Sequence, residues 1–206
     1  MAEKYLKNNN VVKFQATSKG EKMSSDSSLK LSDLPADISE RISAVYEKTG
    51  FIPNVFVRLA TRPDEFRAFF SYHDALMEKE SGLSKSDREM IVVATSAHNN
   101  CLYCVIAHGA VLRIRSKNKL LADQVAINYQ CADLTPKQRA MLDFASKVSK
   151  NSHLVSEKDS ELLKGFGFSE DDIWDIVAIT AFFGMSNRLA NALAIEPNDE
   201  FYGMGR

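Results

Sequence analysis

The chain has 206 residues, of which 45% are hydrophobic and 26% charged, and its formal net charge is −1. These values predict a soluble globular protein with one core, and they give no reason to expect a nucleic-acid partner or an anionic membrane surface. The first residues lack the apolar core of a signal peptide, and no segment is apolar for long enough to span a bilayer. Three cysteines make no disulfide scaffold, so a reducing, cytoplasmic location is expected.

Helical patterning begins after a polar start. Residues 1–30 are rich in Lys, Ser and Asn, which predicts a mobile tail. Residues 31–206 are expected to form a single all-α domain. Within them, the segment 52–77 has apolar residues at helical spacing and is punctuated by prolines. No stretch alternates between apolar and polar residues for long enough to predict a strand.

Three more helices are predicted from capping signals. Segments 84–87 and 169–172 both have the pattern Ser-x-x-Asp, and 135–138 is Thr-Pro-Lys-Gln. Each precedes an apolar run, as expected when a side chain caps the first turn of a helix. The helices opening at 84 and 169 have similar patterns, which suggests a weak internal duplication.

Residues 101–109, CLYCVIAHG, place two of the three cysteines one helical turn apart. The preceding pair, Asn99 and Asn100, is unfavourable inside a helix and favourable in a turn or cap. If Asn100 caps the next helix, Cys101 and Cys104 lie in its first turn. Unpaired N–H groups and the positive end of the helix dipole favour a thiolate there.

Glu89 and His108 complete a candidate site. Positions 101, 104 and 108 fall within roughly 60° around a helix, so their side chains share one face. If the chain folds back at the asparagine pair, Glu89 and His108 lie at similar heights in a helical hairpin. A carboxylate raises the basicity of a neighbouring imidazole, which can then take a proton from Cys104 directly or through water.

The pattern E-x11-C-x-x-C-x3-H, filled by Glu89, Cys101, Cys104 and His108, resembles the alkylhydroperoxidase D (AhpD) branch of the carboxymuconolactone decarboxylase-like family. The flanks at 50–77 and 167–199 also resemble peroxidase-related members, so the likeness covers roughly residues 35–200. It implies an all-α fold and a homo-oligomer, often a trimer or hexamer. It also implies reduction of hydroperoxides without a metal, haem or flavin, with electrons from a dithiol or a thioredoxin- or lipoyl-type donor.

The resemblance also implies roles for individual residues. Cys104 attacks the peroxide, Cys101 resolves the intermediate, and His108 and Glu89 relay the proton. Cys104 is accordingly expected to have the lower pKa, because His108 lies one turn from it. One departure weakens the relay: some members have a histidine before the second cysteine, where this chain has Tyr103, a poor base at neutral pH.

Several alternatives remain open at this point. A zinc site formed by Cys101, Cys104 and His108 needs a fourth ligand from Cys131 or His98. A lactone decarboxylase, as in the other branch of the family, needs no dithiol. A non-enzymatic, redox-sensing oligomer, or a dithiol–disulfide oxidoreductase with little peroxidase activity, also fits the motif. Two simpler assignments complete the analysis: Cys131 is structural, and the remaining histidines are solvated or core residues, namely His73, His98 and His153.

Overall fold

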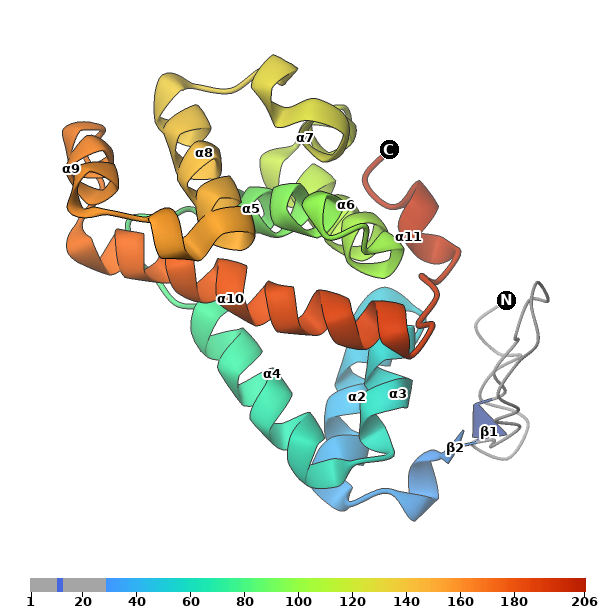
Figure 1. Ribbon diagram of the computed structural model, residues 1–206. Coiled ribbons are helices and arrows are strands. Elements are labelled where there is room, and N and C mark those ends of the chain that lie inside the picture. The colour runs from blue at the N-terminus through green and yellow to red at the C-terminus, as the bar shows by residue number, and fades with distance from the viewer. Residues whose placement is uncertain (1–10, 13–28) are drawn as a thin grey trace. The chain divides into compact units, whose positions relative to one another are not determined.

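The computed structural model describes residues 11–12 and 29–206 (Figure 1). The predicted tail, 1–30, therefore lies outside the described residues except at its strand pair. That pair joins β1 (Val11–Val12) to β2 (Leu29–Lys30) in antiparallel register, with Val11 opposite Lys30.

The rest of the described chain is helical, which confirms the all-α prediction. The chain divides into two compact units, one ending at Phe69 and one beginning at Phe70, and the division falls inside α4. None of the helices in the described part is long and apolar enough to cross a membrane. In chain order the helices are η1 (Leu31–Asp33), α2 (Ala36–Thr49), α3 (Asn54–Ala60), α4 (Pro63–Met77), α5 (Lys85–His98), α6 (Leu102–Ser116), α7 (Leu121–Asn128), η2 (Tyr129–Cys131), α8 (Pro136–Asn151), η3 (Ser152–Leu154), α9 (Glu157–Gly165), α10 (Glu170–Ala192) and α11 (Glu200–Gly203).

The predicted capping signals start the helices where expected. Ser84, Thr135 and Ser169 are the N-caps of α5, α8 and α10, and each forms a reciprocal capping box with the residue three positions later. A fourth box, at Ser156, starts α9 and was not predicted. Each box satisfies two backbone N–H groups that the first helical turn leaves unpaired, so local sequence alone fixes these starts.

The first unit is held by contacts between α2, α3 and α4. Ile38 and Ile42 of α2 are buried. The rings of Phe56 and Phe66 meet edge to face, with centroids 5.9 Å apart. On its surface, Arg67 donates two hydrogen bonds to the carboxylate of Asp37 at 2.7 and 2.9 Å. Bidentate geometry of this kind gives the ion pair a defined orientation.

The second unit is built around α5. This helix packs against α6, α7, α8 and α10, which surround it in Figure 1. Every residue from Arg88 to Ser96 is buried. A helix covered on all sides has few positions where a charged side chain can reach solvent, so the charged residues within it need partners inside the protein. The internal duplication suggested by the similar sequences of α5 and α10 stays a prediction.

The turn between α5 and α6 differs from the prediction by one residue. The chain does leave the helix at Asn99, as expected, but Asn100 adopts a left-handed conformation (φ 51°) and is not the cap. Cys101 is the N-cap of α6, and its N–H donates to the carbonyl of Ser96 at 3.0 Å. Asparagine tolerates this backbone conformation better than most residues do, which explains its place in the turn.

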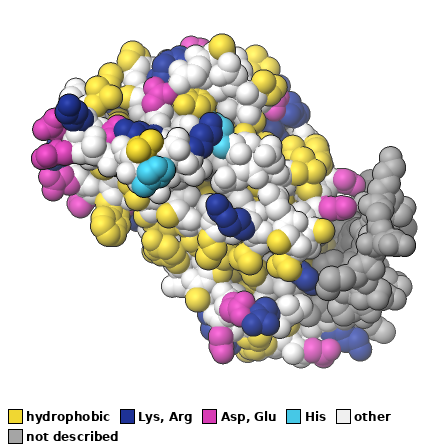
Figure 2. Space-filling view, in the orientation of Figure 1, with side chains coloured by type: hydrophobic (Ala, Val, Ile, Leu, Met, Phe, Trp, Pro, Cys, Tyr) yellow, Lys and Arg dark blue, Asp and Glu magenta, His cyan; other side chains and the backbone are white. Residues whose placement is uncertain are grey.

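Acidic side chains gather over α9 and the start of α10, at the left edge of the face shown in Figure 2. The first turn of α10 holds Glu170, Asp171 and Asp172, and that of α9 holds Glu157 and Asp159. Negative charge at the N-terminus of a helix interacts favourably with the helix dipole. The cluster therefore has a local structural explanation.

Candidate functional site

The two thiols lie at the N-terminus of α6. As the N-cap, Cys101 accepts a hydrogen bond on Sγ from the backbone N–H of Cys104 at 3.4 Å. Both cysteines are free and buried, with 0% and 1% of their surfaces exposed. The thiol of Cys101 thus takes the position where backbone donors stabilise a negative charge, and Cys104 lies one turn along the same helix.

These surroundings separate the acidities of the two thiols. The pKa of Cys101 is lowered to about 7, mainly by a hydrogen bond from the thiol of Cys104. Burial opposes this shift, and the backbone N–H of Cys104 adds to it. The same thiol–thiol hydrogen bond, followed by burial, raises the pKa of Cys104. The directions of these two shifts run opposite to the expectation that Cys104 is the more acidic thiol, an expectation that stays to be tested by alkylation of the two cysteines. The hydrogen bond between the two thiols is the larger cause, and the N-cap position of Cys101 adds the backbone N–H of Cys104.

Polar side chains from α10 surround the thiols. Asn187 is fully buried and its amide donates to Ser96 Oγ at 2.9 Å, while its Oδ1 accepts from Asn99 at 2.8 Å. Asn187 also forms a hydrogen bond that lowers the pKa of Cys101. A carboxamide fixed on two sides is a rigid polar partner for a buried sulfur. The sequence analysis missed this residue, which is 86 positions from Cys101.

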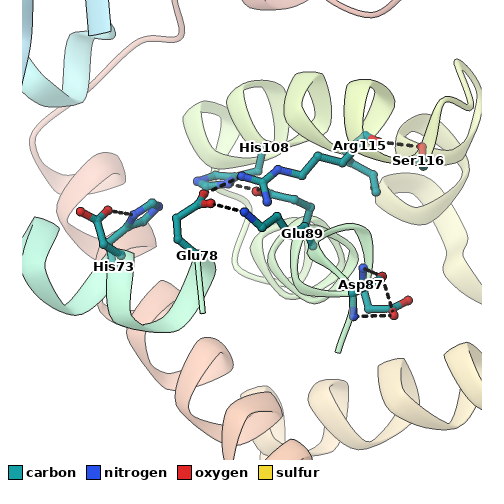
Figure 3. Close-up of polar contacts among 11 residues, drawn as sticks. His73, Glu78, Asp87, Glu89, His108, Arg115 and Ser116 are labelled. Carbon is teal, nitrogen blue, oxygen red and sulfur yellow. Dashed lines mark hydrogen bonds and ion pairs between the residues drawn. The ribbon is translucent and has the colours of Figure 1, made fainter. Parts of the chain in front are cut away.

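Glu89 and His108 meet as predicted. His108 Nδ1 and Glu89 Oε2 are 2.8 Å apart, with 17% and 4% of the two side chains exposed (Figure 3). Since a carboxylate accepts, Nδ1 is the protonated nitrogen and Nε2 of the neutral ring is the basic one. His108 lies one turn beyond Cys104 on α6, although no hydrogen bond joins its ring to either sulfur within the described chain.

Arg115 extends this pair toward the surface. Its Nε lies 3.8 Å from Glu89 Oε1, and its guanidinium also pairs with Glu78 at 2.6 Å. Glu78 in turn pairs with Lys85 at 2.7 Å (Figure 3). Charges of alternating sign therefore run from the solvent to the imidazole of His108. An arrangement of this kind stabilises each buried charge through its neighbours.

A second imidazole, that of His73 on α4, lies beside His108. The ring centroids are 6.5 Å apart, and Phe183 contacts both rings, at 4.7 Å from His108 and 6.2 Å from His73. In Figure 3 the ring of His73 lies on the side of α4 that faces His108. The sequence analysis treated His73 as a solvated or core residue, because nothing local indicates a partner 35 positions away.

The other predicted residues lie elsewhere or form different contacts. Tyr103 is buried and its ring meets Phe201 of α11 edge to face, with centroids 6.4 Å apart. Cys131 is exposed in η2 and accepts a hydrogen bond from Asn128 at 3.3 Å. Within the described residues, no three His, Cys, Asp or Glu side chains are grouped so that they could hold a metal ion. The proposed fourth ligand His98 instead contacts the ring of Tyr129.

The arrangement supports two kinds of chemistry on one helix. Two thiols within hydrogen-bond distance can exchange between the dithiol and disulfide states. An imidazole oriented by a carboxylate can accept or donate a proton at its other nitrogen. Because both groups lie on α6 within two turns, electron transfer and proton transfer can be coupled.

Comparison with known proteins places this fold among related ones. The model of the carboxymuconolactone decarboxylase family matches residues 63–147, which include all four residues of the motif. The crystal structure of an alkylhydroperoxidase AhpD core, a peroxidase-related protein from Ralstonia eutropha JMP134, is 65% identical, with a TM-score of 0.85. The match covers 86% of this chain and 94% of that one. Comparison with curated proteins gives no match.

Two further structures are similar. A peroxidase-related protein from Silicibacter sp. TM1040 is 42% identical, with a TM-score of 0.81 over 84% of this chain and 91% of that chain. The debrominase Bmp8, in complex with 2,3,4-tribromopyrrole, is 20% identical, with a TM-score of 0.71 over 85% and 92% of the two chains. At 20% identity the second similarity concerns the fold alone.

Proposed function

Because this chain belongs to the AhpD-like, carboxymuconolactone decarboxylase-like family, we propose that it is a thiol-dependent peroxidase that uses Cys101 and Cys104 as a redox-active dithiol. The observation that carries the proposal is the pairing of two buried thiols, one with a pKa of about 7, on the helix that bears His108. A thiolate is the form that attacks a peroxide, and a second thiol within reach can resolve the product.

The reaction has three balanced steps. The thiolate of Cys101 attacks the distal oxygen of a hydroperoxide, so that an S–O bond forms, the O–O bond breaks and the alkoxide leaves after protonation as an alcohol. Cys104 then loses its proton and attacks the sulfenic acid, forming the disulfide and releasing water. An external dithiol reduces this disulfide and is itself oxidised to a disulfide.

In this cycle His108 accepts and donates protons, and Glu89 orients its ring. His108 lies one turn beyond Cys104, so its Nε2 accepts the thiol proton, directly or through one water, as Cys104 attacks. Glu89 holds the ring at Nδ1 and stabilises the imidazolium that forms. This division of roles reverses the order implied by the family resemblance, because here Cys101 is the more acidic thiol.

The partners follow from the same chemistry. We propose a hydroperoxide as the substrate, a small dithiol or a thioredoxin- or lipoyl-type protein as the electron donor, and a homo-oligomer, a trimer or hexamer, as the active form. A cytoplasmic location suits a dithiol that must be reduced after each cycle. The burial of both thiols favours the smallest hydroperoxides.

A second candidate is a redox-sensing protein or dithiol–disulfide oxidoreductase with little peroxidase activity. One observation favours it: Tyr103 packs against Phe201 and adds no base beside Cys104. In that case the disulfide still forms reversibly, but peroxide is consumed slowly.

The decisive experiment is stopped-flow consumption of hydrogen peroxide, tert-butyl hydroperoxide and cumene hydroperoxide, with dithiothreitol or dihydrolipoamide as donor. Cys104→Ser should complete one round and leave a sulfenic acid on Cys101, whereas Cys101→Ser should lose the fast phase. Cys131→Ser is the matched control, because this thiol is exposed and outside the motif.

The alternatives give distinct results. A sulfenic acid trapped on Cys104 in Cys101→Ser would show that Cys104 attacks. Reversible disulfide formation with oxidised dithiols, but no peroxide consumption above that of the double cysteine variant, would favour the second candidate.

A further inference from the structure

The imidazoles of His73 and His108 are held in matching ways by separate carboxylates. His108 Nδ1 lies 2.8 Å from Glu89, and His73 Nδ1 lies 3.1 Å from Asp74. In each ring this leaves Nε2 as the nitrogen without a hydrogen bond to another described residue. The side chains are 17% and 25% exposed, so solvent reaches both from one side.

Aromatic rings enclose the pair on its inner side. Phe182 and Phe183 of α10 lie with their centroids 6.1 and 6.2 Å from His73, and Phe183 lies edge-on to His108. These rings exclude other polar partners from that side. The centroids of the two imidazoles are 6.5 Å apart, a separation that one bridging water can span.

We propose that His73 and His108 act as a coupled imidazole pair, in which His73 takes the proton that His108 receives from the dithiol and passes it to solvent. The inference rests on the proposed function of the dithiol. His73 acts through His108 and does not touch the sulfurs, so it is a positioning residue for the proton. In the second step of the cycle, the proton of Cys104 moves to Nε2 of His108, then to Nε2 of His73 and to solvent, while the hydroxide that leaves the sulfenic acid takes a proton from solvent and departs as water.

The surrounding charges favour one proton on the pair and oppose two. Glu89 and Asp74 each support a positive ring, and α10 packs Phe182 and Phe183 against the pair. Burial first, and then the positive charge of His108, lower the pKa of His73, although its hydrogen bond to Asp74 opposes the shift.

The charged groups beyond Glu89 are paired with one another. Their net effect on the protonation of His73 and His108 is therefore smaller than the effect of one ring's charge on the other. Arg115 approaches Glu89 from α6, and Glu78 follows the end of α4 and pairs with both Arg115 and Lys85. The like-charge repulsion within the pair is therefore the interaction that a substitution at His73 removes.

The test compares His73→Gln with His153→Gln, a matched change at an exposed histidine in η3. The first measurement is an NMR titration of imidazole nitrogens in ¹⁵N-histidine-labelled protein. We expect the pKa of His73 to rise in His108→Gln and to stay unchanged in His153→Gln, because the positive charge of His108 is one cause of its lowering. The second measurement is the rate of disulfide formation in a single turnover with hydrogen peroxide, as a function of pH.

Near neutral pH, His73→Gln should slow disulfide formation roughly tenfold, less than the 10²–10⁴-fold expected for a direct acid–base group. Free imidazole should restore most of the rate, which it would not do if His73 only packed against Phe182. An unchanged pKa of His73 in His108→Gln, or a rate loss in His73→Gln that imidazole does not relieve, would overturn the inference.

Other outcomes keep the inference separate from the proposed function. If His73→Gln does not fold, independent single-site titrations of the two rings in the wild-type protein would overturn the pair. If the wild type consumes no peroxide but the pKa of His73 still rises in His108→Gln, the proposed function fails while the imidazole pair stands.

Discussion

Arg88 and Glu89 are neighbours in α5, both are buried, and they carry opposite charges. The terminal nitrogens of Arg88 donate to the carbonyl of Leu76 and to Ser81, and pair with Asp175 at 2.9 Å; its Nε alone lacks a partner among the described residues. Glu89 instead holds an imidazole whose second nitrogen is uncommitted.

The two residues differ in the kind of partner that each charge contacts. The partners of Arg88 are fixed groups of the end of α4, of the loop after it and of α10, so this charge joins segments that are far apart in the chain. The partner of Glu89 can gain or lose a proton without breaking the contact. Burial of a charged residue therefore does not by itself indicate a functional site. A buried charge whose partner has a polar atom without a hydrogen bond is a better indication.

The largest expected effect is a loss of activity on substitution of Glu89, which a substitution of Arg88 should not cause. Glu89→Gln keeps a hydrogen-bond acceptor for His108 but removes the negative charge that stabilises the imidazolium. Single-turnover disulfide formation should slow by roughly 10²–10⁴-fold. Glu80→Gln, an exposed change in the loop between α4 and α5, is the control. A rate within twofold of the wild type would remove Glu89 from the proton path.

The next largest effect concerns stability. Arg88→Met leaves the carboxylate of Asp175 buried with only Lys79, 2.6 Å away, as a charged partner. Breaking one side of a buried pair should lower the free energy of unfolding by about 3–5 kcal/mol, measured by urea denaturation. Arg88→Met combined with Asp175→Leu should lose less than the sum of the single changes. Loss of activity in the folded fraction of Arg88→Met would contradict the purely structural role.

Sequence reasoning found one of these neighbours and missed the other for a physical reason. Glu89 was found because a helical hairpin brings it to the height of His108, and both flank the same turn. The partner of Arg88 is 87 positions away on α10, a distance that no helical period encodes. His73 was missed for the same reason.

Local signals accounted for most of the fold. Helix starts at Ser84, Thr135 and Ser169 were predictable because a capping box involves four consecutive residues. The start of α6 was not predicted, because its N-cap is Cys101 and not Asn100. A difference of one residue at a helix boundary lies below what sequence patterns resolve.

A smaller effect is expected in the pH dependence of the reduced protein. The pKa of Cys101 is about 7 in the folded protein and near 9.0 for an ordinary thiol, so the folded state binds fewer protons between these values. The free energy of unfolding should therefore rise from pH 7 to 9, on the order of 1–2 kcal/mol.

Above pH 9 the sign reverses. The raised pKa of Cys104 keeps a proton on the folded protein that the unfolded chain loses, so stability should fall. Urea denaturation with excess reductant at several pH values measures both limbs. The rise between pH 7 and 9 should disappear in Cys101→Ser; a rise that persists there would mean that another group causes it.

The smallest expected effect concerns the N-terminal cap of α5, the helix that bears both Arg88 and Glu89. Ser84→Ala removes the capping hydrogen bond to Asp87, 3.1 Å long, at the start of α5 (Figure 3). Stability should fall by about 1 kcal/mol, measured by thermal or urea denaturation, with the single-turnover rate unchanged. A change in rate larger than the change in folded fraction would show that the two charges depend on the first turn of α5.

The left-handed residue Asn100 has a consequence for how related chains should be grouped. It belongs to a turn of fixed length, and an α-helix rotates by about 100° per residue. One residue inserted before Cys101 would keep the two cysteines and the histidine in their motif, yet it would turn His108 away from Glu89. The count of eleven residues between Glu89 and Cys101 is thus a stricter criterion for shared chemistry than the cysteine pair alone.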